Sequence, residues 1–222
     1  MKKVVKGLII KDLYNLEKYK LSFLINFVVF ACLIFLSPML LNAFPTMIIT
    51  YMIMIALSSF SFDEVSKSEK YILSLPITKK DVVLSKYILV NLLTTVALVF
   101  AIMLAIFINS IIKGNIQTIE IIVSGLSGYI VLMAFACIQI PSIYKFGYEK
   151  GRINGVIITS IIGIVITGII LFISKIPVVI NNIYIIENLI EKTFFIILSI
   201  IYIVLNYISY KVSCNFYNKR EV

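Results

Sequence analysis

Residues 21–62 read LSFLINFVVF ACLIFLSPML LNAFPTMIIT YMIMIALSSF SF and contain no charged side chain. A transmembrane helix needs about 20 consecutive apolar residues, and a charge at its centre is costly. The stretch is long enough for two such helices, and Pro38 and Pro45 bracket the expected turn near residues 41–44. We therefore predict two membrane spans, at about residues 21–41 and 44–62.

The chain as a whole has the same apolar character. Of the 222 residues in the full sequence, 61% are hydrophobic and 14% are charged, and the mean hydropathy is +1.06. Soluble domains have about 45–50% apolar and about 25% charged residues. Backbone groups in lipid must be hydrogen-bonded internally, so the apolar segments are expected to be helices. The fold class predicted is an all-α membrane protein, residues 1–222 forming one domain with four further transmembrane helices, six in total, at residues 87–112, 121–144, 153–174 and 193–210.

Lysine and arginine are divided unevenly between the two sides of this six-span layout. Of the 20 basic residues, 17 fall on the side that carries both termini, and only Lys113, Lys175 and Lys192 fall on the other. Basic residues are enriched in cytoplasmic loops, so both termini are predicted to be cytoplasmic. The net charge of +9 then reflects this bias and attraction to anionic lipid, and nucleic acid is not an expected partner.

The segment before the first span, residues 2–18, has the pattern of an amphipathic helix. Its apolar residues recur at helical spacing among lysines, which favours a helix lying in the cytoplasmic interface. Two roles stay open: a basic anchor that sets topology, or an element that touches a cytoplasmic partner. The apolar positions are Val5, Leu8, Ile9, Leu13 and Leu16.

Several kinds of chemistry are excluded by residues that are missing. The chain has no His, its three cysteines (Cys32, Cys137 and Cys214) are far apart, and no Gly-Lys-Ser/Thr of a phosphate-binding loop occurs. We expect no catalytic residue, no metal site and no cofactor in this chain, which disfavours an intramembrane enzyme. No Asp or Glu falls inside a predicted span, which argues against an ion-coupled carrier. Energy for uphill transport would then enter from the cytoplasmic side.

The longest predicted cytoplasmic loop, residues 63–86, has internal structure of its own. Ser66 or Ser68 can cap a short helix that Pro76 ends, with Tyr71, Ile72 and Leu75 expected on one face. Thr78 followed by Asp81 resembles a capping box that starts the third span. The alternative is a solvated surface loop without a helix.

This loop and its surroundings resemble the ABC-2 type permeases, the membrane subunits of ATP-binding-cassette exporters. The resemblance rests on Phe62-Asp63-Glu64, the aromatic Tyr71, Ser74-Leu75-Pro76-Ile77-Thr78-Lys79 and Lys86-Tyr87. The motif covers residues 60–87, and the six-span layout extends the resemblance over nearly the whole chain.

The resemblance implies a multi-pass protein of the bacterial plasma membrane that works with other chains. Two permease subunits, more readily a homodimer than a heterodimer, would associate with two copies of a cytoplasmic ATPase subunit, which would bind ATP and Mg. Residues 66–76 match the coupling helix that docks on the ATPase, and residues 2–18 match the connecting helix. The residues expected to make or support the contact are Glu64, Lys67, Glu69, Lys70, Tyr71, Leu75 and Pro76.

The cargo is predicted only by class. A pathway through these spans would be apolar with a few amides and hydroxyls, which suits a hydrophobic or amphipathic cargo. Small members of the family include exporters of amphipathic peptides such as phenol-soluble modulins, and systems of antimicrobial peptide resistance, so a peptide is expected. The rival function is a membrane scaffold or immunity protein that transports nothing. The candidate pathway residues are Asn26, Asn91, Thr94, Gln139 and Asn206.

Two smaller features leave alternatives open. Residues 176–186 contain Pro177 and fit either short re-entrant helices on the outer side or a loop resting on the membrane. Small residues concentrate in the fourth and fifth spans, where they let helices approach closely, either within one chain or between subunits. These small residues are Ser124, Gly125, Ser127, Gly128, Gly155, Ser160, Gly163 and Gly168.

Overall fold

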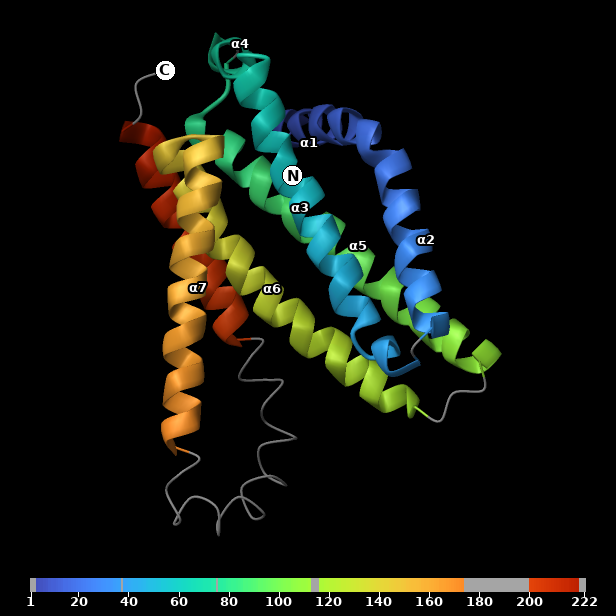
Figure 1. The fold of residues 1–222 in the computed structure, drawn as a ribbon. Coiled ribbons are helices and arrows are strands. Elements are labelled where there is room, and N and C mark those ends of the chain that lie inside the picture. Colours follow the sequence, from blue (N-terminus) through green and yellow to red (C-terminus); the bar gives the residue numbers. More distant parts are fainter. Residues whose placement is uncertain (1–2, 37, 75, 113–115, 174–199, 220–222) are drawn as a thin grey trace.

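The computed structural model describes residues 3–36, 38–74, 76–112, 116–173 and 200–219. These residues form helices and short turns, with no strand among them (Figure 1). A further helix, without a label in Figure 1, covers residues 200–219. The labelled helices are α1 (Lys3–Leu16), α2 (Lys20–Leu36), α3 (Phe44–Val65), α4 (Ser68–Ser74), α5 (Lys79–Ile112), α6 (Thr118–Phe146) and α7 (Tyr148–Ile173).

The two spans predicted from residues 21–62 correspond to α2 and α3. Between them lies a 3₁₀ turn at Pro38–Leu41, and Pro45 stands in the first turn of α3, where its missing N–H leaves no carbonyl unpaired. Among the described residues, α3, α5 and α6 are long and apolar enough to cross a membrane. Most of the predicted sixth span's first half and all of residues 176–186 lie outside the described residues, so six crossings and the cytoplasmic termini stay predictions.

The helices on either side extend into the predicted cytoplasmic loop at residues 63–86. α3 continues to Val65, and α5 begins at Lys79, so both helices reach beyond the predicted membrane spans. The expected capping box is present at the start of α5: Thr78 Oγ1 donates to Asp81 Oδ2 at 2.7 Å and accepts from the Asp81 N–H at 3.2 Å. The loop was delimited by where charge begins, whereas the helices continue past their apolar segments.

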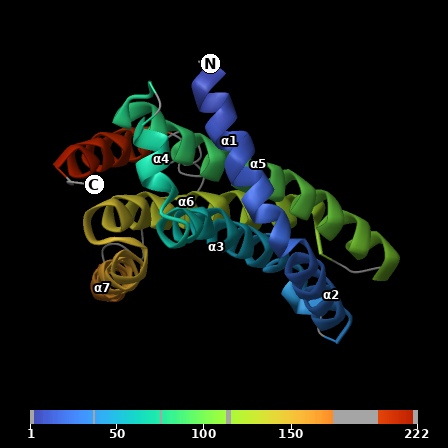
Figure 2. The ribbon, with the colours of Figure 1, turned by 90° about the horizontal axis from the view of Figure 1, so that it is seen from above.

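Helix α1 lies across one end of the bundle. Figure 1 shows it turned sharply away from α2, and Figure 2 shows it crossing above α3 and α5, on which it packs. Val5, Leu8, Ile9 and Leu16 are buried there, while Leu13 is exposed. The amphipathic helix is therefore confirmed, but its apolar face rests on protein.

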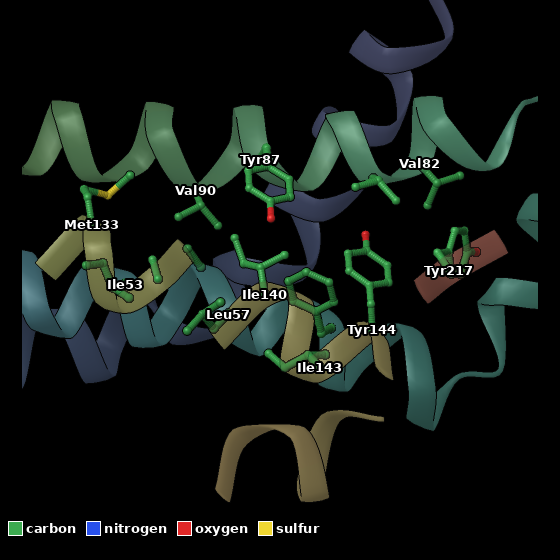
Figure 3. Close-up of a cluster of buried hydrophobic side chains, with 14 of the residues drawn as sticks. Ile53, Leu57, Val82, Tyr87, Val90, Met133, Ile140, Ile143, Tyr144 and Tyr217 are labelled. Carbon is green, nitrogen blue, oxygen red and sulfur yellow. The ribbon is translucent and has the colours of Figure 1, made fainter. Parts of the chain in front are cut away.

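The core runs between α3, α5 and α6 and reaches helix 200–219. Figure 3 shows Tyr87 of α5 and Tyr144 of α6 directed into the space between these helices. The Tyr87 hydroxyl lies 2.5 Å from Ser209 Oγ and 2.9 Å from Ser213 Oγ, and Ser209 donates to the Cys137 carbonyl at 2.6 Å. These hydrogen bonds hold helix 200–219 against both α5 and α6.

Packing within the chain accounts for three of the small residues. A Cβ at Gly128 would clash with Thr46 of α3, and one at Gly155 would clash with Gln139 of α6. Gly125 is less restricted, because its Cβ would lie 3.1 Å from Ile102 Cγ1, a tight contact that a small shift of Ile102 would relieve. These glycines allow α6 to approach α3, α5 and α7 closely.

Candidate functional site

Four charged side chains meet where α1, α3 and α5 pack together. The Lys86 ammonium lies 2.9 Å from Asp12 Oδ2 and 2.5 Å from Asp63 Oδ2. The Lys11 ammonium lies 3.2 Å from Asp12 Oδ1 and 2.6 Å from Asp63 Oδ1. The two cations and two anions therefore alternate, and the group, which we call the ionic cluster, is formally neutral.

The centre of the ionic cluster is removed from water. The side chains of Asp12 and Lys86 are only 1% and 4% exposed. Lys86 also donates to Ser59 Oγ at 3.2 Å and to the Ser59 carbonyl at 3.3 Å, so its three N–H donors have acceptors close at hand. Desolvating each ion costs several kcal/mol, which the ion pairs to Asp12 and Asp63 and the bonds to Ser59 offset.

Lys11 forms the outer, partly exposed edge of the ionic cluster. Burial by itself lowers the pKa of this ammonium, but the carboxylates of Asp12 and Asp63 outweigh burial and raise the pKa above its ordinary value. Lys11 therefore keeps its charge at any physiological pH.

The short helix α4 is attached directly to the ionic cluster. Its first residue, Ser68, donates from Oγ to Asp63 Oδ1 at 2.8 Å. The turn between α3 and α4 contains Lys67 with φ of 51°, a left-handed conformation that is uncommon for a residue with a side chain. Ser66, one of the two expected caps of α4, instead lies at the end of α3 and donates to the Phe62 carbonyl at 2.5 Å.

Tyr71 and Ile72, two neighbouring residues of α4, differ in exposure, which corrects the prediction that they share a face. Tyr71 is 79% exposed, whereas Ile72 is 7% exposed and packs into the main core. Adjacent residues on a helix are about 100° apart, so a short helix can expose one and bury the next. The α4 backbone includes Glu69 and Lys70, whose side chains lie outside what the structure describes, as does all of Leu75; Pro76 follows in an exposed bend.

Glu64 connects the end of α3 to the start of α7. Its Oε2 accepts the backbone N–H of Tyr148, the first residue of α7, at 2.6 Å. A carboxylate is favourable there because the first N–H groups of a helix have no partner within it. Gly147, which ends α6, has φ of 82° and ψ of 172°, a conformation essentially restricted to glycine, and its missing Cβ leaves room for the Glu64 carboxylate.

We expect Gly147→Ala to lower the free energy of unfolding by about 1–3 kcal/mol, because alanine is strained at this backbone conformation. The matched control is Gly163→Ala, since a Cβ at Gly163 in α7 meets nothing within 4 Å among the described residues. That control should be neutral or stabilise the protein by up to about 1 kcal/mol. Thermal unfolding in one detergent compares the two, and equal midpoints would contradict the assigned role of Gly147.

The predicted cargo-pathway residues do not form one site. Asn91 and Asn206 meet beside Tyr202 and line an open groove of about 640 Å³ between α5 and helix 200–219. Thr94 is fully buried and bonds the Val90 carbonyl. Asn26 bonds the backbone of its own helix, at Ser22, and Gln139 lies between α6 and α7.

The sequence pattern does not indicate the ionic cluster, because its members stand in a lysine-rich helix and in a charged loop that are far apart along the chain. One signal was available: Asp12 lies three residues after Ile9 and four before Leu16, on the apolar face of α1. A carboxylate on that face needs a buried cation. The sequence alone does not show that Lys86 supplies it.

The fold and these contacts define a helical membrane protein whose charged end carries an exposed short helix on a buried ionic cluster. A model of the family described as "ABC-2 family transporter protein" matches residues 7–218, and the chain belongs to this family. It is thus a membrane permease subunit of an ABC transporter, a class that associates with an ATP-binding subunit. Neither the search of curated proteins nor that of solved structures found a match.

Proposed function

We propose that this chain is the permease of an exporter that moves a hydrophobic or amphipathic cargo, in particular a peptide, out of the cell. ATP and Mg are held by two copies of a cytoplasmic ATPase subunit, and two copies of this chain form the pathway. The observation that carries the proposal is the exposed Tyr71 on α4, a helix whose first residue, Ser68, is hydrogen-bonded to Asp63 of the ionic cluster.

The ionic cluster supports a role for α4 as the coupling helix. A force applied to α4 reaches Asp63 through Ser68, and Asp63 is paired with Lys86 of α5 and Lys11 of α1. Because buried charges cannot separate without a large electrostatic cost, these helix ends are expected to move together. One docking event on α4 can thereby shift several membrane helices.

Movement of the C-terminal end of α3 is also expected to reach α7. The Glu64 carboxylate accepts a hydrogen bond from the Tyr148 N–H, so displacement of this end of α3 also displaces the start of α7. Glu64 thus supports the ATPase contact from inside the permease.

One groove on the permease supports the proposal of an amphipathic cargo. The groove between α5 and helix 200–219 is lined mainly by apolar and aromatic side chains, with the amides of Asn91 and Asn206 and the hydroxyl of Thr95 among them. Such a surface suits a peptide with an apolar face better than an ion or a sugar.

Transport by reconstituted complexes tests this function. The full chain is purified with the ATPase subunit that accompanies it and placed in vesicles with the ATPase outside. A fluorescent amphipathic peptide should accumulate inside with ATP and not with a non-hydrolysable analogue. A chain that binds no ATPase, or a complex that moves no peptide or apolar dye, would instead favour a non-transporting scaffold or immunity protein.

A further inference from the structure

Two hollows follow one another along the seam between α5 and helix 200–219. The first is the groove of about 640 Å³ described above, and the second, of about 690 Å³, lies beside the start of α5. Leu84 and Tyr210 line both, so the two hollows adjoin. Together they form one surface, which we call the α5 groove, and its character changes from charged to apolar along its length.

The charged end of the α5 groove carries an excess of lysine. Lys79 and Lys80 line this end. The ammonium of Lys211 lies 4.6 Å from the centroid of the Tyr207 ring, which lines the apolar part. Asp81 is the one carboxylate among the described lining residues, and it already belongs to the capping box of α5. Three cations against one anion favour an anionic ligand.

The apolar part of the α5 groove follows a single stripe of α5. Leu84, Ile88, Leu92 and Val96 line it and recur at every fourth residue, so they lie on one face of the helix. Twelve residues separate Leu84 from Val96, which corresponds to about 18 Å of helix. The hydrocarbon of one leaflet is about 15 Å deep, half the thickness of the bilayer core. The stripe is therefore long enough for one lipid acyl chain.

The floor of the α5 groove is held in place by contacts within the chain. The rings of Tyr87 and Tyr210 pack edge to face, with centroids 5.8 Å apart and an interplanar angle of 88°. The Tyr87 hydroxyl is in turn hydrogen-bonded to Ser209 and Ser213. A groove that is already formed loses little conformational entropy when a ligand binds.

We propose that the α5 groove binds one anionic phospholipid of the surrounding membrane. Lys79, Lys80 and Lys211 attract the headgroup, and an acyl chain lies along the apolar stripe of α5. The proposed peptide cargo accounts only for the apolar part of the groove and would have to displace this lipid. A second copy of the chain, with a net charge of +9, is poorly matched to the lysine-rich end. An anionic phospholipid matches both ends.

Native mass spectrometry of the full-length permease, titrated with single lipids in detergent, tests the proposal without the ATPase or a cargo. Each lysine near an anionic membrane surface contributes about fivefold to binding, so wild type should bind its first phosphatidylglycerol about tenfold or more tightly than phosphatidylcholine. Lys80→Gln combined with Lys211→Gln should abolish this preference. The control, Lys150→Gln combined with Arg152→Gln, removes the same charge from two exposed residues of α7 and should retain it.

A second pair of variants tests the apolar stripe. Leu92→Trp fills the stripe from an exposed position and should weaken the binding of both lipids, whereas Leu33→Trp, at an exposed leucine of α2, should not. Equal binding of the two lipids by wild type, or the same preference in both double variants, would overturn the proposal and indicate unspecific lipid only.

Two further outcomes of the same measurement would identify a different occupant. Displacement of the lipid by soluble glycerol phosphate would mean that no acyl chain is held in the groove. A change in the ratio of monomer to dimer in Leu92→Trp, with lipid binding unchanged, would mean that a second copy of the chain covers it. Either result contradicts the proposal, and neither bears on ATP-driven transport.

Discussion

Lys86→Met is expected to lower the free energy of unfolding by about 3–5 kcal/mol, the largest effect of any single change considered. Removing one partner of a buried ion pair leaves an uncompensated buried charge. Here Asp12, 1% exposed, would keep only the partly exposed Lys11, which it would share with Asp63. Thermal and denaturant unfolding in one detergent measure the loss.

Two further variants show whether the loss comes from buried charge. Lys80→Met removes an exposed lysine from the same helix and should change stability by less than about 0.5 kcal/mol. Adding Asp12→Asn to Lys86→Met should recover much of the loss, because Lys11 and Asp63 then remain as one neutral pair. Additive losses in the double variant would contradict the alternating arrangement of the ionic cluster.

Tyr71→Ala is expected to weaken association with the ATPase subunit tenfold or more, with no change in thermal midpoint. Exposed aromatic residues that fill a pocket on a partner often carry 2 kcal/mol or more of binding energy. Tyr71 is 79% exposed, so its removal costs the isolated permease almost nothing. The dissociation constant of the detergent-solubilised complex is the quantity to measure.

For Ile72, next to Tyr71 in α4, we expect an effect on the stability of the permease. Ile72→Ala removes a buried side chain from the main core and should destabilise the permease by about 2–5 kcal/mol. Tyr207→Ala, at an exposed tyrosine of helix 200–219, should leave both stability and association nearly unchanged. If Tyr71→Ala and Tyr207→Ala bind the ATPase equally well, α4 does not dock through Tyr71.

Helices and their order could be predicted from the sequence because those signals are local. The length of the apolar run and its two prolines indicate α2 and α3 with the turn between them. The Thr78–Asp81 capping box indicates the start of α5. The helices α3 and α5 extend beyond the charge-free segments, because charged residues can lie inside a helix when they are paired. In the folded protein Asp63 and Lys86 lie inside helices and neutralise each other.

The ionic cluster and the orientation of α4 depend on packing between distant segments. Asp12 and Lys86 are 74 positions apart, and only the crossing of α1 over α5 brings them together. Seven residues of α4 are too few for periodicity to tell which side faces the core. Ile72 is buried because the turn at Lys67 directs it between α3, α5 and helix 200–219.

Photo-crosslinking from α4 tests the central claim, that ATP-driven motion enters this permease through that helix. A benzoyl-phenylalanine is placed at Tyr71 or, as the control, at Tyr207, and the complex with its ATPase subunit is irradiated. Position 71 should form a covalent adduct between the permease and the ATPase subunit, and position 207 should not. An ATPase that co-purifies with the permease but is not crosslinked from position 71, or is crosslinked equally from both positions, would contradict the account.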